Sequence, residues 1–461
     1  MRKRFSAPAL LLALVIAAGC SNANVPVTGS PGATTPGGTA PPPGQGASPS
    51  NTAASVGSLA PGSTGTPGSD GSPGPSASGD PGTTGSPGAS PAPTTSPDPS
   101  SVPAGDPRVQ AGLASLTTDE DLVGQLLLLG WLGNTPASVG PTLTALHPGG
   151  IVYIGSNADR AAGALAINRR IDRVAANLDI PEPFKAIDLE GGSVQRIFDI
   201  PNLGSNMAFG KTHPTDAQAC QRGATHAAQL NSMDFNMDLA PVLDVLTNPH
   251  NTVIGNRSYG SSPALVARLG ANYILGLQGG GILGVGKHFP GHGDTTVDSH
   301  LGLPVVPYGL KHLQKVELVP FVRAMQPAIG ISSIMVGHLA LPKLDPTRTP
   351  ASLSKPIIHG LLRDRLGFHG LVMTDDLGAM AAITSKYSPA QAAVMAIEAG
   401  ADMLIITGDI AHQTVYRDAL LAALHSGQLP RARLMEAVRH VLQAKARFGL
   451  LGGGGPPAVA C

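Results

Sequence analysis

The sequence predicts an α/β protein with a single (β/α)8 TIM-barrel-like domain at residues 106–450, preceded by a disordered linker. Short apolar runs alternate with helical stretches through this range, and most of the runs are continuous, as expected for parallel strands that are covered on both faces. The length of the range and the lack of a G-x-G-x-x-G or phosphate-loop motif favour a closed barrel over an open doubly wound sheet. The expected strands are residues 150–155, 184–188, 237–245, 282–288, 331–337, 371–375 and 402–407.

The barrel domain is expected to open with a capped helix in "LTTDEDLVGQLLLLG". Thr117 is the expected N-cap, because Glu120 follows three residues later and an amphipathic run comes after it.

The first 20 residues are typical of an export signal. A basic start is followed by a short apolar run and small residues, which is too short for a spanning helix. The segment "AAGC" resembles a lipobox, in which Cys20 would be acylated, although Ala17 stands where lipoproteins usually have leucine. We therefore expect an extracytoplasmic lipoprotein anchored to the membrane, with plain secretion as the alternative.

Residues 21–105 consist almost wholly of Gly, Pro, Ser, Thr and Ala. Such a segment has too few apolar residues to offset the chain entropy of ordering, so we expect a disordered tether. Residues 451–461, "LGGGGPPAVAC", are expected to form a flexible tail.

Composition excludes some partners. The chain has 30 basic and 30 acidic side chains, so it carries no charge bias toward nucleic acid. Aromatic residues make up 3% of the chain, with Trp131 as the single tryptophan, which argues for a pocket rather than a stacking platform if the ligand is a carbohydrate.

Two cysteines remain besides Cys20. Cys220 lies among small apolar residues at helical spacing, which predicts a buried thiol. A disulfide to Cys461 is the alternative in an oxidising compartment. The cysteines predict no metal site.

Polar residues follow the expected strands, where the carboxyl ends of barrel strands converge on one pocket. Asp is also common at strand ends as a helix cap or turn former, and this structural explanation stays open for Asp244 and His338. The polar residues at these ends are Asp188, Asp244, Lys287, His288, His338 and Asp375.

The motifs "DLEGGSVQR", "APVLDV", "VIGNRSYG", "KHFPGHGDTTVDSH", "MVGHLALP" and "VMTDDLGAMAA" occur in this order. Together they resemble the family 3 glycoside hydrolases, specifically the β-N-acetylhexosaminidase branch in its lipoprotein form. The resemblance runs from about Leu116 to Gly449. It implies Asp375 as the catalytic nucleophile and His300, on a mobile loop, as the acid/base.

Asp298 lies two residues before His300, and in an extended segment the two side chains would share one face and could hydrogen-bond. Asp298 would then orient His300 and stabilise its imidazolium. Asp376 is interpreted as a helix cap for the segment that follows it.

The resemblance also implies that Asp188, Arg257, Lys287 and His288 bind sugar hydroxyls. His292 and Asp294 receive no role. A metal site built from His288, His292, Asp294 and His300 is the competing interpretation, but the proline and glycines between them argue against helical ligand spacing. We expect no metal and no cofactor.

The expected function is a retaining exo-β-N-acetylhexosaminidase that removes terminal β-linked N-acetylglucosamine from peptidoglycan-derived fragments through a covalent glycosyl-aspartate intermediate. The alternatives are a phosphorylase of the same fold, since imidazole does not repel phosphate as a carboxylate would, and a non-catalytic saccharide-binding lipoprotein. Catalysis assisted by the 2-acetamido group of the substrate is a third route. The expected partners are a small saccharide or muropeptide and, through the lipid anchor, the membrane; we expect a monomer that binds no nucleic acid.

Overall fold

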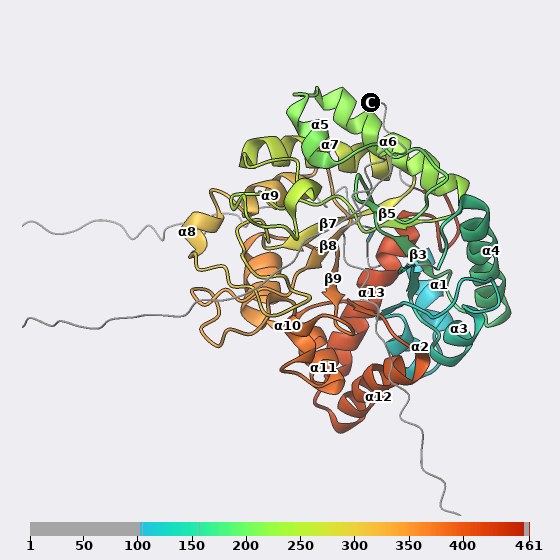
Figure 1. Cartoon of the computed structure of the whole chain (residues 1–461). Coiled ribbons are helices and arrows are strands. Elements are labelled where there is room, and N and C mark those ends of the chain that lie inside the picture. The colour runs from blue at the N-terminus through green and yellow to red at the C-terminus, as the bar shows by residue number, and fades with distance from the viewer. Residues whose placement is uncertain (1–101, 104, 156, 456–460) are drawn as a thin grey trace, which may run out of the picture. The chain divides into compact units, whose positions relative to one another are not determined.

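The computed structural model describes residues 102–103, 105–155, 157–455 and 461 (Figure 1). The expected signal peptide with Cys20 and nearly all of the expected linker lie outside the described residues. None of the described helices is long and apolar enough to cross a membrane.

The strands form a closed barrel in the order β1-β10-β9-β8-β7-β6-β3-β2, and all neighbours in it are parallel. The predicted fold class is thereby confirmed. The barrel strands are β1 (Leu127–Leu129), β2 (Gly150–Val152), β3 (Phe184–Ile187), β6 (Met237–Asp238), β7 (Leu283–Phe289), β8 (Ser333–Val336), β9 (Leu371–Asp376) and β10 (Met403–Ile406). Every strand expected from the sequence is present, although the strand expected at 237–245 is regular over only two residues.

Helices surround the barrel (Figure 1). Successive strands are connected through α3 (Gly140–Leu146), α4 (Ala161–Asn177), α6 (Asp216–Ser232), α7 (Pro263–Gly279), α9 (Leu318–Met325), a π-helical segment (Pro356–Arg365) and α11 (Pro389–Ala399), and α12 (Ile410–Ser426) follows the last strand, β10. Shorter elements in the connections are a β4 (Leu189–Gly191) and β5 (Val194–Gln195) hairpin, α5 (Asn206–Lys211), α8 (Leu310–Leu313) and α10 (Ala381–Thr384).

The start of the domain differs from the prediction. A helix α1 (Pro107–Ser115) comes first, and the next helix, α2 (Asp119–Gly124), is capped by Thr118 rather than Thr117. The Thr118 hydroxyl accepts from the Asp121 amide and the Asp121 carboxylate accepts from the Thr118 amide. The leucines that follow leave the helix and form β1, because they pair with β2 and β10 and so close the barrel.

The barrel interior is filled by side chains from the strands and is closed at one end by α13 (Arg431–Arg447). Val441 and Ala444 of α13, with Phe448 just after it, pack in one cluster with strand residues such as Leu128 and Phe184. Phe184 is the first residue of β3, and Lys445 of α13 donates to the Gln125 side chain just before β1, so α13 lies at the amino ends of the strands. The opposite mouth, at the carboxyl ends, is the one left open for a site.

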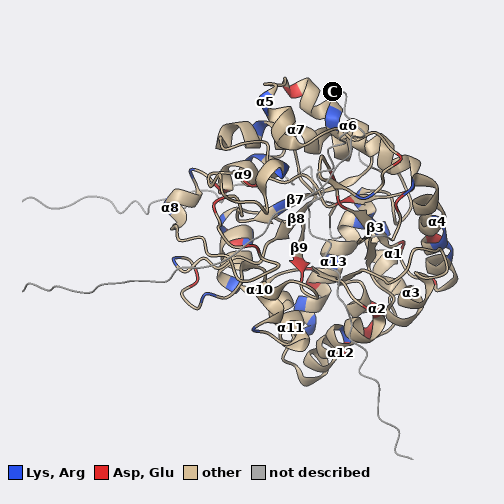
Figure 2. Ribbon diagram, viewed as in Figure 1, with Lys and Arg blue, Asp and Glu red and all other residues tan. Residues whose placement is uncertain are grey.

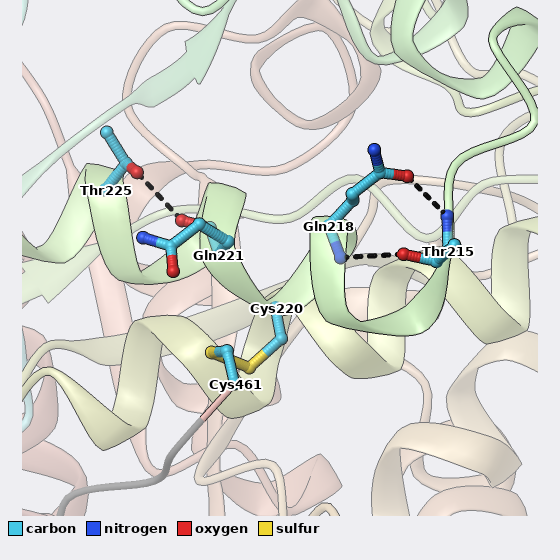
Figure 3. Close-up of a disulfide and its surroundings, with 6 residues drawn as sticks. All are labelled: Thr215, Gln218, Cys220, Gln221, Thr225 and Cys461. Carbon is cyan, nitrogen blue, oxygen red and sulfur yellow. Dashed lines mark hydrogen bonds between the residues drawn. A yellow bond between two sulfur atoms is a disulfide. The ribbon is translucent and has the colours of Figure 1, made fainter.

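A disulfide joins Cys220 on α6 to Cys461, with the two Cα atoms 5.5 Å apart (Figure 3). The prediction of a buried free thiol is therefore wrong. Thr215 and Gln218 cap the start of α6 with two reciprocal hydrogen bonds of 3.2 and 2.8 Å and thereby fix the turn that carries Cys220. The Cys220 side chain is buried, as its neighbours indicate, but its sulfur faces the last residue of the chain.

Candidate active site

Asp375 is the last residue but one of β9, and Figure 2 shows the end of this strand in red, the colour of acidic residues. Its Oδ1 accepts a hydrogen bond of 2.9 Å from the Asp376 amide. Burial raises the pKa of Asp375. This effect is outweighed by four groups that lower the pKa, namely His288, His338, the Asp376 amide and Lys287, so the pKa lies below its usual value. The carboxylate is therefore ionised at neutral pH, as a nucleophile must be.

Asp376, the next residue, has a structural role different from the predicted helix cap. Its Oδ1 accepts from the amides of Gly378 and Thr407 at 2.8 and 3.1 Å, and its Oδ2 accepts from the Thr407 hydroxyl. Helix α10 begins only at Ala381 and has Met380 at its N-cap. Asp376 thus ties the end of β9 to the end of β10 and holds the strand that presents Asp375.

The predicted pair of Asp298 and His300 is formed. Asp298 Oδ1 lies 2.8 Å from His300 Nδ1 and also accepts from the His300 amide at 2.9 Å. The segment is a tight turn rather than the extended segment we expected, because the amides of Leu301 and Gly302 both donate to the Asp298 carbonyl. The turn brings the Asp298 carboxylate next to the His300 imidazole. The His300 side chain is 57% exposed.

The loop that carries this pair is held against the segment that follows Asp375. The amide of Ala382, in α10, donates to the Ser299 carbonyl at 3.1 Å, and Ser299 is buried. The structure therefore places the His300 loop at the same barrel mouth as Asp375.

His288 is oriented by Asp244. His288 Nδ1 lies 2.7 Å from Asp244 Oδ2, while Asp244 Oδ1 accepts from the amides of His288 and His292. Asp244 is fully buried and satisfied, so it is a positioning group for the segment at the end of β7. Because Nδ1 is engaged, Nε2 is the His288 nitrogen left to bind a ligand at the mouth.

Next to this segment lies a cluster of alternating charges, in which Lys287 and Glu190 are buried and Asp188, Arg257 and Arg196 are partly exposed. Lys287 Nζ is 2.7 Å from Asp188 Oδ1 and 2.8 Å from Glu190 Oε1. Arg257 donates to both oxygens of Glu190 at 2.8 Å, and Arg196 Nη2 donates to Asp188 Oδ2 at 3.2 Å. Charged donors and acceptors in this arrangement suit a polyol, which needs both kinds of partner.

The pKa values of the cluster follow from its charges. Burial raises the pKa of Glu190, but Arg257 and Lys287 lower it to about 2. Burial likewise raises the pKa of Asp188, yet Lys287 and Arg196 bring it well below its usual range. For Lys287, burial lowers the pKa, and Asp188 and Glu190 raise it more. All three groups are charged at neutral pH.

Glu190 and Arg196 were not predicted as site residues. Both lie inside "DLEGGSVQR", and a signal for Glu190 was present, because it lies in the short strand β4 two residues after Asp188, which directly precedes that strand. Arg257, predicted to bind sugar, has its guanidinium held by Glu190 and by the Val253 carbonyl.

The residues left open by the sequence are placed as follows. His338 Nε2 bonds the Asp376 carbonyl at 3.0 Å and Nδ1 the Ser352 hydroxyl at 2.7 Å, so His338 supports the end of β9. Burial lowers the pKa of His292 to about 4, and its Nδ1 lies 2.6 Å from the Thr295 hydroxyl.

Asp294 accepts a hydrogen bond of 2.9 Å from the Thr247 hydroxyl. Over the described part of the chain, no group of three or more His, Cys, Asp or Glu side chains is placed to hold a metal ion.

A closed parallel barrel whose carboxyl-end mouth carries a carboxylate, an Asp–His pair and a cluster of paired charges defines a TIM-barrel protein with a candidate active site at that mouth. Residues 117–444 match the model of the glycosyl hydrolase family 3 N-terminal domain. The chain belongs to the family 3 glycoside hydrolases.

Relatives support this assignment. Beta-hexosaminidase LpqI of Mycobacterium tuberculosis is 35% identical over 73% of this chain and 84% of its own length. Beta-hexosaminidase A of Pseudoalteromonas piscicida is 31% identical over 68% of this chain, which spans only 56% of that protein. Among solved structures, a family 3 β-N-acetylglucosaminidase from Paenibacillus sp. str. FPU-7 has a TM-score of 0.70 and 37% identity, covering 73% of this chain and 64% of that one.

Proposed function

We propose that this chain is a retaining exo-β-N-acetylhexosaminidase that removes terminal β-linked N-acetylglucosamine. The observation that carries the proposal is that the ionised Asp375, at the carboxyl end of β9, and the hydrogen-bonded Asp298–His300 pair, on the loop after β7, lie at the same end of the barrel. A retaining glycosidase needs one group to attack the anomeric carbon and a second to protonate the leaving oxygen.

In the first step the Asp375 carboxylate attacks C1 of the sugar, and the bond from C1 to the leaving oxygen breaks. The imidazolium of His300 gives its proton to that oxygen, and Asp298 stabilises the charged ring beforehand. In the second step neutral His300 takes a proton from water, the water oxygen bonds to C1, and the Asp375 ester is broken. The catalyst returns to its starting protonation state.

The charged cluster would hold the sugar during both steps. Asp188 offers acceptors to the sugar hydroxyls and Lys287 and Arg196 offer donors, while Glu190 keeps the cations of Lys287 and Arg257 in place. His288, with Nδ1 fixed by Asp244, offers its Nε2 to the same ring.

We further propose an extracytoplasmic location, with Cys20 as the lipid-anchored residue and peptidoglycan-derived fragments as substrates. The Cys220–Cys461 disulfide supports the location, because disulfides form and persist in oxidising compartments outside the cytosol. Beta-hexosaminidase LpqI of Mycobacterium tuberculosis, of which this chain covers 84%, is a similar relative and supports a hexosaminidase activity.

The test is an assay of the purified chain with an aryl N-acetyl-β-glucosaminide and with soluble muropeptides, each with and without inorganic phosphate. Release of free N-acetylglucosamine, abolished in Asp375→Ala, supports the proposal. Formation of N-acetylglucosamine 1-phosphate would make the protein a phosphorylase. Absence of turnover in folded protein from pH 5 to 8 would leave a saccharide-binding protein.

A further inference from the structure

Two apolar side chains on the His300 loop face solvent. Val297 is 42% exposed and Leu301 is 82% exposed, whereas most large apolar side chains of the described barrel domain are buried. A single exposed apolar residue needs no explanation, but these two flank the Asp298–His300 pair on either side in the sequence.

Val297, Leu301 and the His300 side chain are all exposed on this loop. The turn at Asp298 brings Val297 back toward the Leu301–Gly302 corner, since a Cβ on Gly302 would lie 3.6 Å from Val297 Cγ1. The other side of the turn is anchored, because buried Ser299 bonds α10 through its carbonyl.

If the proposed function holds, the chemistry of the site indicates which part of the substrate would contact Val297 and Leu301. The acid/base must reach the leaving oxygen, so the residues beside it lie next to the leaving group. The sugar that is cleaved off lies at the Asp188 and Lys287 cluster instead. Exposed Val297 and Leu301 therefore border the space that the leaving group occupies.

We propose that Val297 and Leu301 form an apolar wall of the leaving-group subsite, and that they select leaving groups with an apolar face. The C–H face of a second pyranose ring fits this description, as does an aryl or acyl group. The wall supplies contact only where the leaving group extends beyond its first carbon. A methyl group is too small to be covered by it.

The test compares two substrates whose leaving groups both need a proton: methyl N-acetyl-β-glucosaminide and N,N′-diacetylchitobiose. The quantity measured is the ratio of kcat/KM for the disaccharide to kcat/KM for the methyl glycoside. In Val297→Ser and Leu301→Ser this ratio should fall by about 3- to 10-fold, since part of the area of one apolar side chain is lost from the contact. The matched control is Val415→Ser on α12, where the valine is 46% exposed on an outer helix, and there the ratio should stay at its wild-type value.

A ratio that stays constant in both loop variants, while wild-type protein hydrolyses both substrates, would overturn the wall and leave the proposed function standing. The wall would also be overturned if Val415→Ser lowered the ratio by the same factor as the loop variants. A folded wild type that hydrolyses neither substrate would overturn the proposed function, and the wall with it. Thermal unfolding of each variant checks that the loop substitutions leave the barrel folded.

Discussion

Replacing Glu190 by glutamine should lower the free energy of unfolding by about 3 kcal/mol at pH 7, within the usual range for breaking a buried ion pair. The Glu190 side chain is 1% exposed and is bonded by Arg257 and Lys287 at 2.8 Å each. Glutamine keeps the size of the side chain but removes its charge. Lys287 would then keep its ion pair with Asp188 at 2.7 Å, whereas Arg257 would lose the carboxylate with which it is paired.

The pKa of Glu190 leads to the same magnitude independently. It falls from 4.5 to about 2 in the folded chain, and a difference of this size corresponds to roughly 3 kcal/mol. The pKa of Glu190 is lower in the folded chain than in the unfolded chain. The stabilisation that ionised Glu190 contributes is therefore fully present above pH 4.5 and is lost as the pH falls toward 2. The wild type and Glu190→Gln should therefore converge in stability as the solution is acidified through this window.

The assay is urea denaturation at pH 7 and at about pH 3, inside the window where the linkage acts. The matched control is Glu436→Gln, because Glu436 pairs with Arg433 at 3.2 Å but is 56% exposed. An exposed pair of this kind contributes about 1 kcal/mol or less. A loss at pH 7 in Glu190→Gln no larger than in this control would refute the reasoning.

Three further predictions address the acid/base, the disulfide and the anchor. His300→Ala should slow hydrolysis of sugar leaving groups by about 10² to 10⁴ while an acidic aryl group still leaves in a rapid burst, and azide should restore turnover; equal damage to both leaving groups without azide rescue would count against His300. Cys220→Ser should lower the free energy of unfolding by about 2–4 kcal/mol, as should a reductant on the wild type, and unchanged denaturation would speak against the pairing. Cys20→Ala should release the protein from membranes with kcat unchanged, and a variant that still pellets with membranes would show that Cys20 is not the anchor.

The strands and the barrel were predictable because parallel strands covered on both faces must be apolar throughout. The same reasoning failed for Leu127–Leu129, where the strand directly follows a short helix and the apolar run has no turn residue to separate them. Asp375 and the Asp298–His300 pair were predictable from local motifs. The turn that joins this pair was not, because it depends on the contact between Ser299 and α10.

Long-range contacts account for the residues that the sequence did not assign. Glu190 acquires its role only when the ends of β3 and β7 and the segment of Arg257 come together, which spans 67 positions between Glu190 and Arg257. The disulfide joins residues 241 positions apart, and no local pattern around Cys220 carries that information. Asp244 and His338 looked like either site or support residues, and their partners show that they support the site.

In the proposed mechanism Asp375 attacks the anomeric carbon. The most direct measurement of this step is mass spectrometry of the protein after incubation with a slowly hydrolysed fluorinated N-acetylglucosaminide, followed by peptide mapping. We expect one added sugar, on the peptide that contains Asp375, and no adduct in Asp375→Ala. Turnover with no adduct would contradict the role of Asp375, and catalysis assisted by the 2-acetamido group would give this result. An adduct on another carboxylate would contradict it as well.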